Sequence, residues 1–311
     1  MKIPANGVDL KNTFVSGQCF RWGHYTDDGN FVYGTPDENG FWEGVVYGVP
    51  VRLIQDKSYI YFDSPAKEVF VPQIGKPLSI EDFLNFYLRT DLDLSKVYRQ
   101  ISKDRFVKEA IERYRGLTIL RQEPFETLIS YMISPMNTVE KIAAKLSEIA
   151  KLIGRKIVFR NKTFYSFPSP SDFLKKKEEF FSKRLKLRFG LEQKKNILRA
   201  VEWSKNGGFS GLYGLEYTEV VGELVKLRGV GRKIADCVAL FSLDRLEAVP
   251  FDVHIKRITI RLYGNRLGKK PRGTSEYEFF GNFWRGYFGD LAGFAQEYLY
   301  IASRDGMFNQ P

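Results

Sequence analysis

The sequence predicts an α+β protein in which an antiparallel β-sheet is followed by a mainly α-helical part. Short runs of aromatic and β-branched residues fill residues 31–63, and from about Ile80 onward the apolar residues follow a helical spacing. The 311 residues, 43% of them hydrophobic, can bury a substantial core in two or three subdomains. We place the sheet part, with flanking helices, at residues 1–118 and the helical part at residues 119–311, and we expect the C-terminal helix to pack back on the first part.

The predicted sheet is an antiparallel meander. Three runs, "FWEGVVYG", "VPVRLIQD" and "SYIYFDS", are separated by glycines and by a turn at Asp56-Lys57. In the helical part, one apolar face that is typical of a core helix is formed by Phe125, Leu128, Ile129, Met132 and Ile133.

A basic segment interrupts the predicted helices. The run "RKIVFRNKTFYSF" indicates a hairpin with Asn161 and Lys162 in its turn. A helix is then predicted from an N-cap at Ser171 or Asp172 to near Gly190, with its lysines on a solvated face.

The charge favours a polyanionic partner. The net charge is +11 and the pI is near 9.4, and lysine and arginine side chains that neutralise phosphates gain affinity by releasing counterions. Charge alone does not decide the point, because many basic proteins bind no nucleic acid.

Cysteine and histidine are scarce. Cys19 and Cys237 lie far apart, and two cysteines cannot hold a four-cysteine zinc site or iron–sulfur cluster. With only two histidines besides, we expect no metal and no cofactor. We find no signal-peptide run and no 18-residue apolar stretch, so we expect an intracellular protein without a membrane partner, cytoplasmic in a prokaryote and nuclear in a eukaryote.

The stretch "RGVGRKIADC" places two cations where a helix begins. Gly229 and Gly231 tighten the chain before this helix, and Arg232 and Lys233 follow in its first turn. A cation there is disfavoured by about 0.3–1 kcal/mol. Either a bound anion compensates, or the amine loses its proton. The pattern of helix, Gly-Val-Gly turn and helix indicates a helix-hairpin-helix, whose amides bind a backbone phosphate, although a tight helical corner with surface cations gives the same pattern.

A carboxylate follows about twenty residues after Lys233. Pro250 favours an extended approach, and Asp252 stands where an N-cap would begin the next helix. Capping alone explains Asp252, but the carboxylate can also return to face the amine across a cleft.

These residues carry a family resemblance. The segment "LRGVGRKIADCVALFSLDRLEAVPFDVHIKR" resembles the helix-hairpin-helix, Gly/Pro-rich loop and aspartate (GPD) signature of base-excision DNA glycosylases, and in particular the 8-oxoguanine DNA glycosylases. Three more segments are similar to that family, so that the resemblance spans nearly the whole chain: "SGQCFRW" at 16–22, "FETLISYMISPMNTVEKI" at 125–142 and "GNFWRGYFGDLAGFAQEYLYIA" at 281–302.

The resemblance implies the chemistry. Lys233 would attack C1′ of the deoxyribose, displace the damaged base and form a Schiff base, from which β-elimination nicks the strand. Asp252 would stabilise the positive charge that develops on the sugar. Gly229 and Gly231 would hold the DNA backbone, and His254 would contact a phosphate or serve a plain structural role.

The resemblance also implies a base pocket. The carbonyl of Gly17 would accept the N7 hydrogen that 8-oxoguanine has and guanine lacks. Gln296 would bind the base edge, and Tyr300, a phenylalanine in animal enzymes, would stack on its ring, whereas periodicity alone makes Gln296 a surface residue and Tyr300 a core aromatic. Cys237 would pack against the other face of the base, although a plain structural role is equally open.

The opposite-base segments depart from the animal enzymes. Animal enzymes have consecutive asparagines that fill the gap left by the flipped base, and in "SPMNT" Met136 takes the first of those places and Asn137 follows it. Leu191 stands near the position at which animal enzymes have a tyrosine wedge. Glu192 stands near the position at which they have an arginine that donates to cytosine. A thioether and an ionised carboxylate offer no donor to a base edge, so we expect a relaxed opposite-base preference.

Three functions follow from these observations. The first is a bifunctional glycosylase/lyase that acts as a monomer on duplex DNA containing 8-oxoguanine. The second is a glycosylase for alkylated purines, whose relatives of this layout lack the lysine. The third is a non-catalytic helix-hairpin-helix DNA-binding module, which needs neither Lys233 nor Asp252.

Overall fold

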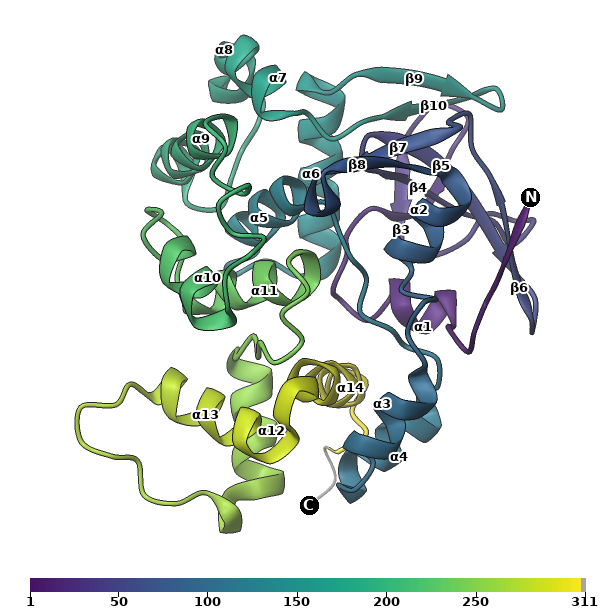
Figure 1. The fold of residues 1–311 in the computed structure, drawn as a ribbon. Helices are drawn as coiled ribbons and strands as arrows, with labels where there is room; N and C mark the ends of the chain where they lie inside the picture. The colour runs from purple at the N-terminus through teal and green to yellow at the C-terminus, as the bar shows by residue number, and fades with distance from the viewer. Residues whose placement is uncertain (309–311) are drawn as a thin grey trace.

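The structure, a computed structural model that describes residues 1–308, places an antiparallel sheet beside a mainly helical body and confirms the predicted fold class (Figure 1). The last three residues of the predicted helical part lie outside the described residues. Six strands form the main sheet, in the spatial order β1 (Lys2–Pro4), β6 (Tyr59–Asp63), β5 (Val49–Gln55), β4 (Trp42–Val46), β2 (Trp22–Tyr25) and β3 (Phe31–Tyr33).

The meander prediction is right for β4, β5 and β6 and wrong for β3. Strand β3 pairs with β2, and β2 separates it from β4. Gly23 permits this pairing, because a Cβ there would lie 1.9 Å from the carbonyl oxygen of Val32. A second hairpin, β7 (Glu68–Val71) and β8 (Lys76–Ser79), was not predicted.

Helices make up most of the rest of the described chain. Within residues 1–118 they are α1 (Leu10–Phe14), α2 (Ile80–Tyr87), α3 (Leu94–Ile101) and α4 (Arg105–Arg113). After residue 118 they are α5 (Pro124–Ile133), α6 (Val139–Ile153), α7 (Pro170–Lys175), α8 (Lys177–Phe181), α9 (Gly190–Lys205), α10 (Tyr217–Leu224), α11 (Arg232–Ser242), α12 (Val253–Tyr263), α13 (Glu276–Phe288) and α14 (Ala292–Arg304).

The hairpin at 155–167 forms, but its turn is shifted by one residue. Strands β9 (Lys156–Phe159) and β10 (Lys162–Tyr165) are joined by Arg160 and Asn161, whose φ angles are +52° and +60°. Lys162 is therefore a strand residue, and its amine lies 3.0 Å from the Glu43 carboxylate. The two positive φ angles suit the tight turn of a hairpin, which fixes the register.

The single helix predicted from Ser171 or Asp172 to Gly190 is wrong. The N-cap is Ser169, which exchanges hydrogen bonds with Asp172 in a capping box. The helix breaks at Lys176 into α7 and α8, and the chain between α8 and α9 is not helical. Proline at the first helical position explains the early start.

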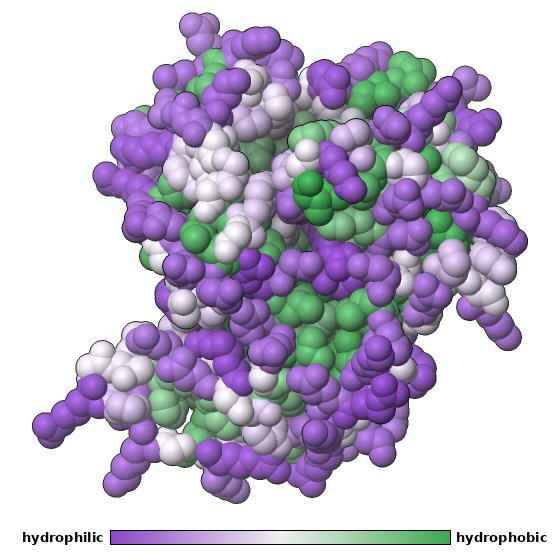
Figure 2. Space-filling view, viewed as in Figure 1, coloured by the Kyte–Doolittle hydropathy of each residue, from purple (hydrophilic) through white to green (hydrophobic). Residues whose placement is uncertain are grey.

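Buried apolar side chains form two main clusters. Under the sheet, Phe14 and Trp22 stack with their ring centroids 4.3 Å apart, and α2 covers them. The other cluster lies among the helices and includes most of α5 and α11. Helix α14 packs against α3, α4 and α12, and the Tyr298 hydroxyl donates to the Leu117 carbonyl over 2.9 Å. In the space-filling view, hydrophilic side chains cover most of one face, and apolar side chains gather in a recess near its middle (Figure 2).

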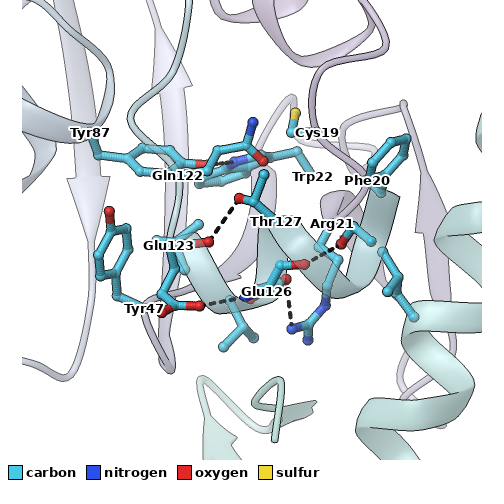
Figure 3. Close-up of a pocket in the computed structure, with 14 residues that line it drawn as sticks. Cys19, Phe20, Arg21, Trp22, Tyr47, Tyr87, Gln122, Glu123, Glu126 and Thr127 are labelled. Atoms are coloured by element: carbon cyan, nitrogen blue, oxygen red, sulfur yellow. Dashed lines mark hydrogen bonds and ion pairs between the residues drawn. The ribbon is translucent and has the colours of Figure 1, made fainter. Parts of the chain in front are cut away.

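The sheet and α5 enclose a small polar pocket of about 30 Å³ (Figure 3). The Arg21 guanidinium lies 3.3 Å from the Glu126 carboxylate, and Glu123 caps α5 by accepting from the Glu126 amide. Burial raises the pKa of Glu123 to about 7. These contacts join the two parts of the chain and leave no room for a substrate.

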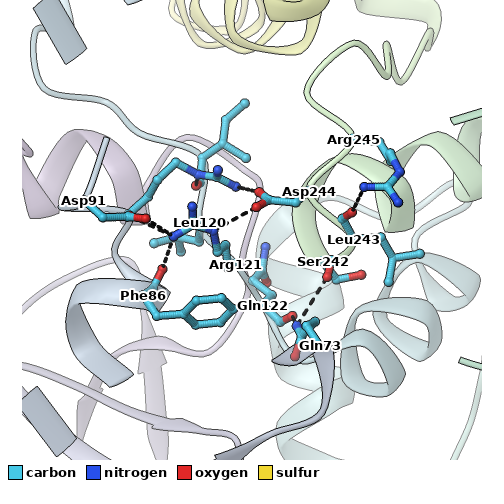
Figure 4. A network of polar contacts seen from close by, with 12 residues as sticks. Gln73, Phe86, Asp91, Leu120, Arg121, Gln122, Ser242, Leu243, Asp244 and Arg245 are labelled. Carbon is cyan, nitrogen blue, oxygen red and sulfur yellow. Dashed lines mark hydrogen bonds and ion pairs between the residues drawn. The ribbon is translucent and has the colours of Figure 1, made fainter. Parts of the chain in front are cut away.

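A polar network fixes the end of α11 to the first part (Figure 4). Arg121 donates to the carboxylates of Asp91, over 2.8 Å, and Asp244, over 3.0 Å. The Gln73 amide donates to the carbonyl of Ser242, the last residue of α11. Because α11 carries Lys233 at its other end, this network positions the candidate nucleophile.

Candidate active site

The helix-hairpin-helix is formed by α10 and α11, as the sequence predicts. Gly229 has a φ of +90°, and a Cβ there would lie 3.0 Å from Cβ of Asn196, so the turn favours glycine. Gly231 is the N-cap of α11 and supplies no side-chain cap. The first amides of α11 are therefore available to an anion such as a DNA phosphate.

Lys233 stands in the first turn of α11 and is partly buried. Its Nζ lies 3.5 Å from the Ser134 hydroxyl and 5.1 Å from the centroid of the Tyr131 ring. Both partners come from the end of α5 and neither is a carboxylate. No ion pair holds the Lys233 amine among the described residues, and the amine borders the cleft, where it can reach a substrate as a nucleophile.

Asp252 is the N-cap of α12, which confirms the predicted cap. Its Oδ1 accepts from the amides of His254 and Ile255, each over 2.9 Å. Asp252 and Lys233 both line a cleft of about 750 Å³ and a smaller inner pocket of about 50 Å³. Asp252 and Lys233 therefore lie at one site, although 19 positions separate them in the sequence.

The four predicted base-pocket residues line the same inner pocket: Gly17, Cys237, Gln296 and Tyr300. Gly17 has a φ of +108°, and a Cβ there would lie 3.0 Å from Cε1 of Tyr300, so the ring packs directly on the glycine. Gln296 is only 3% exposed, which corrects its placement at the surface by periodicity alone, because α14 is enclosed by other helices. Its Oε1 has no hydrogen-bond partner among the described residues.

Cys237 forms part of the pocket wall. Burial raises the pKa of its thiol to about 12, so the sulfur is protonated at neutral pH. A buried neutral thiol offers an apolar contact to a base and is a poor nucleophile.

Four of the predicted DNA-contacting residues lie at the cleft: Met136, Asn137, Gly231 and His254. Met136 is 73% exposed with a φ of +59°, which holds its side chain out of the core. The side-chain carboxamide of Asn137 donates to the Ile133 carbonyl over 2.8 Å.

Leu191 lies outside the cleft lining, on the first turn of α9, and is 57% exposed. The neighbouring Phe189, which the sequence reasoning missed, is 52% exposed. Gln193 connects this turn to α5, because its carboxamide accepts from the Phe189 amide and donates to the Met132 carbonyl. Two apolar side chains are thus held in solvent beside the end of α5.

The sequence reasoning also missed Tyr131, Ser134 and Glu297 among the residues near the amine and pocket. Tyr131 and Ser134 belong to the segment 125–142 that is similar to the family. Their contacts with Lys233 arise only because α5 packs against α11. Glu297 had a visible signal, since it is the one charged residue in the run "AGFAQEYLYIA". No group of three histidine, cysteine, aspartate or glutamate residues within 1–308 is arranged to hold a metal ion, and no described helix has the length and apolarity to cross a bilayer.

Comparison with known proteins assigns the family. Residues 1–128 match the family model of the 8-oxoguanine DNA glycosylase N-terminal domain. The chain is 32% identical to the N-glycosylase/DNA lyase OGG1 of Arabidopsis thaliana, over 97% of this chain and 79% of that protein. The chain belongs to the 8-oxoguanine DNA glycosylase/lyase family.

Solved structures of the family share this fold. The structure of MBOgg1 in complex with a low-affinity DNA ligand has a TM-score of 0.78 and 30% identity, covering 97% of this chain and 93% of that one. The Clostridium acetobutylicum 8-oxoguanine glycosylase/lyase, solved with double-stranded DNA containing cytosine opposite 8-oxoG, has a TM-score of 0.77 and 26% identity, covering 99% of both chains. As a member of this family, the chain is an enzyme, a DNA N-glycosylase with lyase activity.

Proposed function

We propose that this enzyme excises 8-oxoguanine from duplex DNA and then cleaves the strand, with Lys233 as the nucleophile. The observation that supports this most is the shared pocket, which contains Lys233 and Asp252 beside Gly17 and Gln296. We assign the cell compartment that holds the DNA as its place of action, the cytoplasm in a prokaryote or the nucleus in a eukaryote.

In the first step the neutral amine of Lys233 bonds to C1′ as the C1′–N9 bond breaks. The leaving base takes the electron pair and the proton that the Lys233 nitrogen loses on bonding, and Asp252 stabilises the positive charge on the sugar. The nitrogen then forms the C1′=N double bond of the Schiff base as the C1′–O4′ bond breaks and O4′ takes a proton from the nitrogen. The Schiff base withdraws electrons, loses a proton from C2′ and expels the 3′ phosphate by β-elimination. The amides of the α11 N-terminus hold a neighbouring phosphate during both steps.

Selection of the lesion is assigned to Gly17, because a backbone carbonyl accepts the N7 hydrogen of 8-oxoguanine and repels the N7 lone pair of guanine. An unpaired buried acceptor costs about 1–3 kcal/mol, which biases the pocket against the normal base. Tyr300 and Cys237 supply the two faces between which the base would lie. His254 remains assigned to a phosphate at the mouth of the cleft.

Borohydride trapping tests the proposal. The protein is mixed with duplex DNA containing 8-oxoguanine, and borohydride is added to reduce a Schiff base. A covalent protein–DNA adduct is the expected result. Base release without an adduct would instead support an alkyl-purine type of glycosylase, and the absence of both base release and an adduct would support a binding module.

A further inference from the structure

Glu297 is a buried acid in the base pocket that the mechanism above does not use. It follows Gln296 on α14, lines the same inner pocket and is 2% exposed. Its Oε1 has no hydrogen-bond partner among the described residues, and the same holds for Oε1 of Gln296. Two acceptor oxygens of residues that line one pocket therefore lack donors.

The surroundings of Glu297 show that it is not a structural ion pair. Burial raises the pKa of its carboxyl to about 7. A hydrogen bond with the Ser16 hydroxyl and the more distant charge of Arg304 offset part of this increase. The charged and titratable groups that face it are Arg304, Asp252, Cys19, Cys237, Tyr131 and Tyr300. None of these closes a salt bridge with Glu297 in the described residues. A buried carboxyl with an unpaired oxygen is costly to the fold, which points to a ligand that completes it.

The unpaired oxygens define the chemistry of that ligand. Two unpaired acceptors at one pocket suit a ligand that has an edge with two N–H donors. Guanine and its oxidised forms have such an edge, made by N1–H and the 2-amino group, whereas adenine has neither donor at these positions.

We propose that Glu297 is a base-binding residue that, together with Gln296, accepts the N1–H and 2-amino hydrogens of the flipped guanine lesion. The assignment rests on the proposed function, because the lesion must enter this pocket. Gly17 then reads the oxidised side of the base, and the two side chains of α14 read its guanine side. Each of these hydrogen bonds is available to a guanine lesion and not to an adenine lesion, so Glu297 contributes to the discrimination among oxidised purines.

The test compares 8-oxoguanine with 8-oxoadenine, which keeps the N7 hydrogen and the C8 carbonyl but has no donors at positions 1 and 2. Single-turnover excision rates are measured on duplexes containing either base. In Glu297→Ala we expect the preference for 8-oxoguanine over 8-oxoadenine to fall about tenfold from that of the wild type. The same preference can be measured without turnover as the ratio of the affinities for the two duplexes, in Lys233→Gln with and without Glu297→Ala.

Glu123→Ala is the matched control, since it removes another carboxyl whose pKa burial raises to about 7, at the N-terminal end of α5, whereas Lys233 lies near the C-terminal end. Its preference should equal that of the wild type. Glu297→Gln keeps the shape and one acceptor, so it serves if the alanine variant does not fold, and its preference should fall about threefold.

An unchanged preference in both Glu297 variants would overturn the assignment. Borohydride trapping of the wild type on the 8-oxoguanine duplex shows whether only the role of Glu297 fails or the proposed function fails as well. An adduct with unchanged preference rejects the role of Glu297 alone, whereas the absence of any adduct rejects the proposed function and the role of Glu297 with it.

Discussion

At the scale of the residue, the reactivity of Lys233 depends on what surrounds its amine. A hydroxyl and an aromatic face lie near Nζ, and no carboxylate pairs with it among the described residues. The phosphate-binding amides belong to the turn at Gly229 and Gly231, separate from the Lys233 side chain. Chemistry and DNA binding are therefore assigned to different groups of the same hairpin, and substitution can separate them.

Lys233→Gln should abolish base release and borohydride trapping while it leaves affinity for lesion DNA within about threefold of the wild type, because backbone amides supply the phosphate contacts. Single-turnover excision and a binding titration on the same duplex measure the two properties. A parallel loss of affinity would contradict the separation of chemistry from binding.

Asp252 has a capping role and a proposed catalytic role, and two variants distinguish them. Asparagine caps helices about as well as aspartate, so Asp252→Asn should keep the stability but slow excision by at least about a hundredfold. Asp252→Ala should slow excision and also lower the free energy of unfolding by about 1 kcal/mol, since the amides of His254 and Ile255 lose their acceptor. Near wild-type turnover in Asp252→Asn would remove the carboxylate from the mechanism.

At the scale of the element, the sequence predicted correctly those features that depend on only a few neighbouring residues. The cap at Asp252 and the turn at Gly229 and Gly231 follow from backbone rules that act over a few residues. The burial of Gln296 and the place of Glu297 could not be predicted in this way, because they depend on α14 being enclosed by α3, α4 and α12. The pairing of β3 with β2 likewise depends on a contact across the sheet.

The first turn of α9 and the loop at Met136 carry the opposite-base prediction. The Glu192 carboxylate lies 3.3 Å from Arg228 and 3.8 Å from Arg199. A carboxylate in such ion pairs only accepts hydrogen bonds, so it offers no donor to cytosine. We expect 8-oxoguanine to be excised opposite all four bases with rates within roughly tenfold, the effect of about 1.4 kcal/mol. Single-turnover rates on the four duplexes measure this spread.

Glu192→Arg restores a donor at that position and should increase the rate opposite cytosine relative to the other three bases. Leu191→Ala, which shortens an exposed apolar side chain beside it, should slow excision opposite all four bases alike. A hundredfold or larger preference for cytosine in the wild type would show that other residues recognise the opposite base.

At the scale of the whole molecule, three buried carboxyls lie where different elements of the fold meet. Glu123 lies between the sheet and α5, Glu297 lies between α14 and the base pocket, and Asp236 of α11 accepts from the hydroxyls of Tyr217 and Tyr277. Burial raises the pKa of Asp236 to about 6 and those of the two glutamates to about 7. The stability of the whole protein is therefore linked to pH in the neutral range.

The sign of this linkage is fixed by the direction of the shifts. Between about pH 4.5 and 7 the folded protein holds protons on these carboxyls that the unfolded chain has released, so the free energy of unfolding falls as the pH rises. Urea unfolding at pH 5, 6, 7 and 8 should show this fall. Glu297→Gln should flatten the profile and stabilise the protein at pH 8 by an amount on the order of 3 kcal/mol. Glu178→Gln, which removes an exposed carboxylate of α8, should leave the slope as in the wild type. If Glu297→Gln instead destabilised the protein at pH 8, the carboxylate would be supporting the fold, and its place in the pocket would no longer require a ligand to explain it.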